Sequence, residues 1–369
     1  RPAPDSLTGP AGRGTLVRVD PVRHIASEGS VSVIDLKADG AVGEVLVGLH
    51  ASALALSPDG RHLVVANAGS DTLSVLETTT DRVVETIWTK PTPADLLGAS
   101  PNALVFDRSG RRLYACNGTM NAIAVMDFEP GKSRLTGLLP AGWFPGAIVH
   151  DADRSALYVA NIKGISRGRP NARTARTEYN SHQYHGSLSL IPVPGDADLK
   201  RHSGAVLANC RAPLIETARL PARSGQPPRP VPERVGEPSL FKHVVYVIKE
   251  NRTYDQVLGD VPQGNGDPSL CIFGEGVTPN QHKLVREFVL LDNTYCSGIL
   301  SADGHQWSTT AFATDYMEKS FAGFPRSYPD GMGEDENDAL AYSPGGFLWD
   351  LAVQHGKTIR NYGEFAMPA

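Results

Sequence analysis

The sequence places oxygen donors directly after a run of apolar residues. Residues 243–248 read His-Val-Val-Tyr-Val-Ile, and such a continuous run predicts a strand buried on both faces of an α/β sheet. Glu250 and Asn251 follow it, at the carboxyl end of the strand, where folds of this class place ligands. A carboxylate and an amide oxygen suit a divalent metal ion. The same two residues also suit a turn or a helix cap, and the spacing alone favours that simpler interpretation.

A second group of polar residues begins at Ser301. Residues 287–295 predict another strand, and residues 302–321 suit a helix with Ser301 as its N-cap. The N–H groups and dipole at a helix start attract an anion such as phosphate, and a serine hydroxyl beside a divalent metal can attack phosphorus. His305 lies one helical turn further on. A plain N-cap for Ser301 and a surface position for His305 are the alternatives. The helix side expected to be buried carries Trp307, Ala311 and Met317.

Residues 241–369 resemble a phosphoesterase family of the alkaline phosphatase superfamily, which includes bacterial phospholipases C and acid phosphatases. In that family Glu-Asn-Arg-Ser/Thr-Phe/Tyr-Asp follows the first strand, and residues 250–255 match it at every place. The resemblance implies that Glu250 and Asn251 bind the metal, which would be zinc, manganese or calcium. Ser301 to His305 departs from the Thr-x-Pro-Asn-Arg of the phospholipases. It fits the Ser-x-x-Gly-His of cofactor-independent phosphoglycerate mutases, which are more distant relatives, so Ser301 and His305 are the implied catalytic residues.

The rest of the second half predicts further elements but no complete metal site. Residues 344–352 predict a helix that Gly356 ends, and residues 358–362 predict a strand that Glu364 follows. Superfamily members add Asp and His ligands from later strands, which do not appear here, so we expect the catalytic domain to be truncated. The acidic run at residues 330–338 could bind calcium, but a solvated loop explains it more simply.

The first half of the chain repeats a pattern of short strands. An apolar strand, a polar turn, a strand ending in asparagine and an alternating strand recur, and the asparagines are Asn67, Asn117 and Asn161. A period of about 40–50 residues predicts propeller blades, which stack because one sheet cannot cover both of its own faces. These strands, over residues 15–193, resemble YVTN-type β-propeller repeats. Residues 29–35 match the last strand of a preceding blade, and three recognisable blades are too few to close a ring.

We therefore predict a partial N-terminal β-propeller joined to an α/β alkaline-phosphatase-like domain. The blades occupy residues 1–210, with a short helix at 197–209. A Pro/Arg-rich linker spans residues 211–240, and the phosphoesterase domain spans residues 241–369. A long insertion from Lys163 to His185 is either a solvated loop or a basic lip over an anionic substrate. Its charged residues are Lys163, Arg167, Arg169, Arg173, Arg176 and Glu178.

Composition narrows the possible functions. The length of 369 residues favours two domains, and a net charge of −5 does not indicate a nucleic-acid partner. No run of about 18 apolar residues predicts a transmembrane segment. The chain begins at Arg1 rather than Met, which suggests a removed leader or an internal piece of a longer chain. Cys271 and Cys296 either pair in an oxidising compartment or stay free, and no CxxC spacing predicts a zinc knuckle.

Together these patterns predict a bacterial metal-dependent phosphoesterase, periplasmic or secreted, that hydrolyses phosphate esters through a serine nucleophile. Phosphomonoesters, phosphodiesters and phospholipids all remain open as substrates, and so does the oligomeric state. The alternative is a non-enzymatic envelope binding protein, in which the propeller is the ligand platform and the second domain is a degenerate phosphoesterase.

Overall fold

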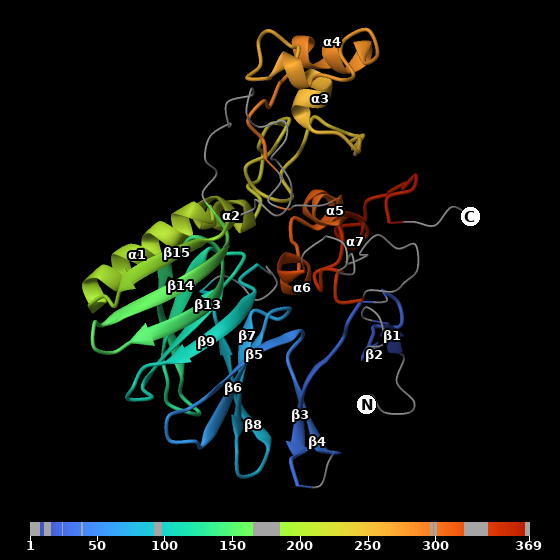
Figure 1. Ribbon diagram of the computed structural model, residues 1–369. Helices are drawn as coiled ribbons and strands as arrows, with labels where there is room; N and C mark the ends of the chain where they lie inside the picture. The colour runs from blue at the N-terminus through green and yellow to red at the C-terminus, as the bar shows by residue number, and fades with distance from the viewer. Residues whose placement is uncertain are drawn as a thin grey trace.

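The first half of the protein consists of antiparallel sheets, and the helices follow them in the chain (Figure 1). The computed structural model describes residues 8–10, 16–23, 25–37, 40–91, 98–164, 185–295, 298, 301–320 and 339–365. Most of the basic insertion, the acidic run at 330–338 and Cys296 lie outside these residues. Among the described residues, no helix is long and apolar enough to cross a membrane.

Two complete four-stranded blades form the middle of the first half, with strand orders β5-β6-β7-β8 and β9-β10-β11-β12. Their inner strands β5 and β9 contact each other, and β9 also contacts β13, so successive sheets stand side by side around a common axis. The strands are β5 (Ala51–Leu56), β6 (His62–Asn67), β7 (Thr72–Glu77), β8 (Arg82–Trp88), β9 (Pro101–Phe106), β10 (Arg112–Asn117), β11 (Ala122–Asp127), β12 (Arg134–Pro140) and β13 (Trp143–Asp151).

Incomplete sheets flank these two blades. On one side β13 pairs with β14 and β14 with β15, and on the other β3 pairs with β4, while β1 and β2 form a separate hairpin. The remaining strands are β1 (Thr8–Pro10), β2 (Leu16–Arg18), β3 (Gly29–Asp35), β4 (Gly40–Val47), β14 (Ala156–Lys163) and β15 (Ser187–Pro192).

The repeat pattern in the sequence did not predict the outer strand of each blade. The prediction that residues 29–35 are the last strand of a blade is wrong, because β4 follows β3 and pairs with it antiparallel. The strands β8 and β12 likewise follow the third strands β7 and β11. On β8 only Ile87 is buried, while Val83, Val84 and Trp88 are exposed. Without an alternation of apolar and polar residues, such an outer strand has no clear signature in the sequence.

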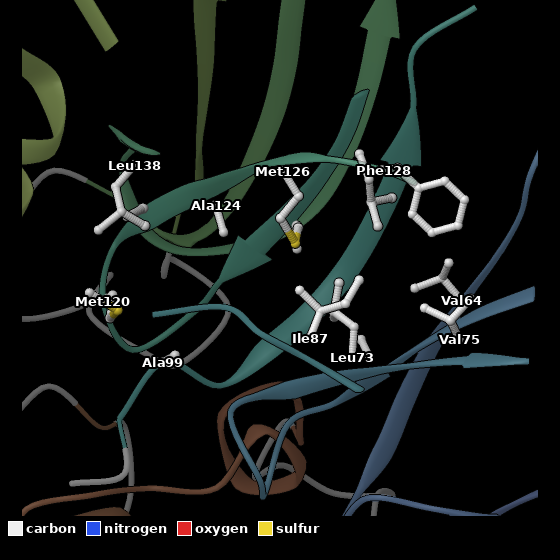
Figure 2. Packing of buried hydrophobic residues seen from close by; sticks show 14 of the residues in the cluster. Val64, Leu73, Val75, Ile87, Ala99, Met120, Ala124, Met126, Phe128 and Leu138 are labelled. Atoms are coloured by element: carbon white, nitrogen blue, oxygen red, sulfur yellow. The ribbon is translucent and has the colours of Figure 1, made fainter. Parts of the chain in front are cut away.

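Burial between neighbouring blades forms the main core. Figure 2 shows Val64, Leu73 and Ile87 of the first complete blade facing Met126 and Leu138 of the second. A second cluster joins the other face of that blade to β14 and includes Tyr114, Ile123, Leu139, Leu157 and Val159. Each fully buried side chain of this size contributes about 1.5–3 kcal/mol relative to an exposed one. Stacking of the sheets therefore supplies the stability that one sheet lacks.

The recurring asparagines tie the second strand of each blade to its surroundings. Asn67 donates its amide N–H to Ser74 at 3.0 Å, and the asparagine of the three-stranded sheet bonds serines of β15 in the same way. The second complete blade has Ala124 where the first has Ser74. Asn117 therefore donates instead to the carbonyl oxygen of Thr89, at the end of the preceding blade, at 2.8 Å.

Helix α1 (Asp196–Asn209) covers the outer strand β12, as the predicted helix at 197–209 anticipated. Leu199 and Val206 are its buried residues. Ser203 accepts a hydrogen bond from the backbone N–H of Leu138 at 2.8 Å, so this N–H at the outer edge of β12 has a partner. A side chain at Gly137 would collide with Leu199, so the close approach requires glycine. Helix α2 (Ala212–Arg219) follows, inside the segment predicted to be a linker.

The second half contains short helices, and its described residues form no sheet. Figure 1 shows α3 and α4 apart from the blades, whereas α5, α6 and α7 lie closer to them. The elements are α3 (Tyr254–Leu258), the 3-10 helix η3 (Pro268–Leu270), α4 (Pro279–Glu287), α5 (Ser301–Thr310), α6 (Asp315–Lys319) and α7 (Leu348–Gln354).

The three strands predicted here are wrong. Residues 243–248, 288–295 and 358–362 form no strand. Val244 and Val245 expose 82% and 86% of their surface, so the first run is not buried on either face. An apolar run indicates that residues favour burial, but a strand also needs a neighbour for its backbone groups. None of these segments pairs with another, and the predicted α/β sheet is absent from the described residues.

The predicted helix over residues 302–321 is two helices. Ala311 has a φ of 54°, which is a left-handed conformation that does not continue α5. The Thr314 hydroxyl then caps α6 by accepting a hydrogen bond from the N–H of Met317 at 3.3 Å. Ser301 is the first residue of α5 rather than a residue before it. Met317 is buried as predicted, Trp307 is half-buried and Ala311 is exposed.

Helix α6 is fixed on the blades by buried charges. Lys163, at the end of β14, pairs with Glu318 at 2.6 Å, and both side chains are less than 10% exposed. Lys163 therefore belongs to this contact and not to a basic lip. Lys319 donates to the carbonyl oxygen of Asn102 at 3.2 Å. Burial raises the pKa of Glu318 to about 7, despite the attraction of Lys163.

Replacement of Lys163 should destabilise the protein in a pH-dependent way. At about pH 8, Lys163→Met leaves a buried carboxylate without its cation, which costs about 3–5 kcal/mol of the free energy of unfolding. At about pH 5 the penalty should shrink, because Glu318 is then protonated. Urea unfolding at both pH values measures it. Lys132→Met is the control, since the Lys132–Glu129 pair is exposed and should contribute about 0–1 kcal/mol. Equal effects of both variants at about pH 8 would contradict the prediction.

Candidate functional site

The four residues predicted to carry chemistry lie in one cluster. The amide of Asn251 donates to the Ser301 hydroxyl oxygen at 2.7 Å. The Nε2 atom of His305 lies 2.9 Å from a carboxylate oxygen of Glu250. These contacts join the segment after residue 248 to the first turn of α5, which is about 50 positions further along the chain.

Glu364 completes this cluster and was noted in the sequence only as the residue after a predicted strand. Its carboxylate lies 2.7 Å from Nδ1 of His305. Asn361 holds its backbone on both sides, because it donates to the Glu364 carbonyl at 2.6 Å and accepts from the Glu364 N–H at 3.0 Å. The signal that could have identified Glu364 is an acidic residue shortly after a predicted strand, as at Glu250.

His305 lies between two carboxylates, and this arrangement sets its charge. Burial lowers the pKa of His305, but the hydrogen bonds and negative charges of Glu364 and Glu250 outweigh it, so the pKa is raised above its ordinary value. The side chain of His305 is 10% exposed, compared with 48% for Glu250 and 21% for Glu364. The imidazole is thus the inner member of the cluster, and Glu250 is the member most open to solvent.

Packing around α5 holds these groups in place. Ala302 and Gln306 are buried on its inner side. The hydroxyl of Tyr246 donates to the carbonyl oxygen of Ser308 at 2.9 Å, which connects the extended segment before Glu250 to the helix. The ring of Phe365 meets His305 edge to face at 6.1 Å. The site is therefore assembled by two segments that meet at α5, one that leads to Asn251 and one that leads to Phe365, and neither of them is a strand.

The cluster supplies suitable but incomplete donors for a metal ion. The carboxylate of Glu250, the amide of Asn251 and the hydroxyl of Ser301 are oxygen donors of the kind that divalent cations take. Within the described ranges, no group of three or more His, Cys, Asp or Glu residues is placed to hold a metal ion. The donor chemistry of the three residues fits a divalent cation, while the described residues do not close its coordination.

A second histidine–carboxylate contact lies near α4, and sequence analysis missed it. His282 is 1% exposed, and its Nε2 atom is 2.8 Å from Asp260. Its Nδ1 atom contacts the hydroxyl and carbonyl oxygens of Thr278. Both ring nitrogens are used within the fold, so this contact fixes α4 on the loop after α3. Cys271 nearby is a free thiol, and its proposed partner Cys296 lies outside the described residues.

Comparisons with known proteins concern the blades. Residues 31–140 match the model of the family described as lactonase, 7-bladed beta-propeller. This match agrees with the blade order of β5 to β12 and supports a β-propeller in the first half. It ends before the second half begins. No curated protein matches the chain.

Two solved structures are similar over part of their length. Hydrazine synthase of Kuenenia stuttgartiensis is 27% identical, with 37% of each chain covered and a TM-score of 0.32. A functionally unknown protein from Desulfotomaculum acetoxidans DSM 771 is 16% identical, with 43% of this chain and 49% of that chain covered and a TM-score of 0.32. The similar region therefore spans less than half of either protein.

The raised pKa of His305 should appear as a pH-dependent contribution to stability. A group whose pKa is higher in the folded protein contributes fully below its unfolded value of 6.5 and loses this contribution as pH rises through the folded value. We expect His305→Gln to reduce the free energy of unfolding more at about pH 6 than at about pH 9. Chemical denaturation at the two pH values tests this, and an equal or smaller loss at the lower pH would show that the two carboxylates do not favour the imidazolium.

Proposed function

We propose that the protein is a metal-dependent phosphoesterase that hydrolyses phosphate esters with Ser301 as its nucleophile. The observation that carries this proposal is the 2.7 Å contact between Asn251 and Ser301. It joins the Glu-Asn motif that resembles the phosphoesterase family to the Ser-x-x-Gly-His motif that resembles its more distant relatives, although the two are far apart in the sequence. An accidental pair of caps or turns gives no reason for these side chains to meet.

Each group of the cluster has a role in the proposed reaction. The Ser301 hydroxyl releases its proton to water as its oxygen forms a bond to phosphorus and the ester P–O bond breaks, and the leaving alkoxide takes up a proton from water. Water then cleaves the phosphoserine and releases phosphate. The backbone N–H groups at the start of α5 would stabilise the charge of the nonbridging oxygens. The Asn251 amide, which donates to Ser301, holds the hydroxyl in position.

Glu250, Asn251 and Ser301 would hold a divalent metal, whether zinc, manganese or calcium. When bound, the ion would lower the pKa of the serine hydroxyl and offset the negative charge of the phosphate. The mainly exposed carboxylate of Glu250 is the natural first ligand, because a site for a dication requires negative charge. Export to the periplasm or the medium remains part of this proposal.

The name of the matched family supports a broader class, a hydrolase of ester bonds, because lactones are cyclic esters. That match lies within residues 31–140, whereas the proposed site lies on and before α5. We propose that hydrolysis takes place in the second half, because the contact between Asn251 and Ser301 lies there, and that the propeller supports this half.

A non-enzymatic binding protein is the second candidate. The specific observation that favours it is the engagement of Glu250 and Glu364 by His305, together with the lack of a three-ligand metal group among the described residues. Metal analysis and a panel of phosphomonoesters, phosphodiesters and phospholipids separate the two candidates. A metal-loaded protein that turns over one of these classes is an enzyme, and one that binds them without turnover is a binding protein.

Ser301→Ala should abolish turnover of phosphate esters and leave the fold and the metal content largely intact. If Ser301 only stabilised the start of α5, the variant would lose about 0.5–2 kcal/mol of stability and keep its activity. Steady-state hydrolysis, measured at a temperature where circular dichroism shows a folded variant, distinguishes these outcomes. Ser308→Ala on the same helix is the matched control and should stay active. Near-normal hydrolysis by Ser301→Ala would reject the nucleophile assignment.

A further inference from the structure

The ring nitrogens of His305 contact two carboxylates and not the proposed nucleophile Ser301. Its Nε2 atom faces Glu250 at 2.9 Å and its Nδ1 atom faces Glu364 at 2.7 Å. Both ring nitrogens are therefore occupied by carboxylates, and the Ser301 hydroxyl receives its hydrogen bond from Asn251 instead. In this geometry His305 is placed to orient Glu250, and it does not take a proton from Ser301.

The orientation of the ring is fixed from the far side. A histidine that donates from Nδ1 to a carboxylate has its ring plane and its second nitrogen set by that bond. Glu364 provides this carboxylate, and Asn361 holds Glu364 by two backbone hydrogen bonds. Phe365, the next residue, packs edge to face on the same imidazole. The support therefore comes from the 361–365 segment.

The orientation of the His305 ring also affects Glu250, which is the most exposed member of the cluster. Glu250 is 48% exposed, and a glutamate on the surface normally samples several rotamers at little cost. The hydrogen bond from His305 selects one of them, because it ties a Glu250 carboxylate oxygen to Nε2 at 2.9 Å. Partners that orient a ligating group commonly contribute to metal affinity without touching the metal.

We propose that Glu364 is a positioning residue, which acts through His305 to hold the Glu250 carboxylate in the orientation that binds a divalent metal. This inference rests on the proposed function, because it assumes that Glu250 is a ligand. It reassigns His305 from a catalytic residue to the connecting member of a Glu364–His305–Glu250 series.

Calorimetric titration of the full chain with Mn²⁺ tests the series. Glu364→Gln keeps the size of the side chain but loses its charge, and it should weaken Mn²⁺ binding about 10–100-fold. Glu287→Gln is the control, since Glu287 lies on α4 in an exposed pair with Lys283, and it should bind as the wild type does. Thermal unfolding of both variants establishes that a loss of affinity is not a loss of fold.

A double-mutant cycle separates positioning from a general structural effect. If Glu364 acts through His305, the variant with both Glu364→Gln and His305→Gln should bind Mn²⁺ no more weakly than His305→Gln alone. Additive losses would overturn the proposal. Asn361→Ala, which loosens Glu364 from outside the cluster, should weaken binding in the same direction, and it carries the test if Glu364→Gln does not fold.

The outcomes distinguish this inference from the function on which it rests. A wild type that binds Mn²⁺, with Glu364→Gln and Asn361→Ala binding equally well, would overturn the positioning role alone. A wild type that binds no Mn²⁺ would overturn the metal-dependent function and the inference together. Weaker binding by Glu364→Gln, with an unchanged Glu287→Gln control and a non-additive cycle, is the result we expect.

Discussion

Each blade-like sheet of this protein has two apolar faces, and only a neighbouring sheet can cover them. Leu73 and Met126 meet between the complete blades, and Tyr114 and Leu157 meet on the next side. The polar contacts of the first half follow from this stacking. Asp71, at a tight turn, accepts backbone N–H groups at the start of the next blade and pairs with the buried Lys90 at 2.9 Å. Buried charges of this kind persist because they are paired and hydrogen-bonded.

The same sheets also position the second half. The pair of Lys163 and Glu318 lies at the end of β14, and Lys319 reaches the start of β9. Helix α6 therefore lies across more than one blade, and α5 precedes it by only a short connection. Burial raises the pKa of Asp315 to about 6 and lowers that of His50, its neighbour at 3.7 Å, to about 4. Burial thus opposes the charged forms of both groups, and the ion pair that connects α6 to the blades is that of Lys163 with Glu318.

The sequence predicts which residues cluster at α5 more accurately than it predicts the secondary structure that carries them. Repetition revealed the blades, because Asn67 and its counterparts mark equivalent turns, but the weakly patterned β8 left no signal. In the second half, the apolar run at 243–248 predicts a buried strand that the structure does not contain. Burial preference is local, whereas pairing depends on a partner that no local pattern reveals. The motifs nevertheless predict residues that the structure brings together, since Asn251 contacts Ser301 and Glu250 contacts His305, whereas Glu364 belongs to no motif.

The site shows why residues can converge without the sheet that was expected to align them. Glu250 and Asn251 follow one segment without a strand and Glu364 follows another, and these residues meet the first turns of α5 around His305. The two ring nitrogens of His305 link the Glu250 and Glu364 carboxylates, which alone would repel each other. His305 therefore connects the two carboxylates of the cluster. Under the proposed function, a metal ion at Glu250 would share a carboxylate that already has a hydrogen bond with His305. That hydrogen bond supplies the orientation of the carboxylate, but it also takes up part of the negative charge that the ion requires, so the metal affinity would depend on the balance between these two effects.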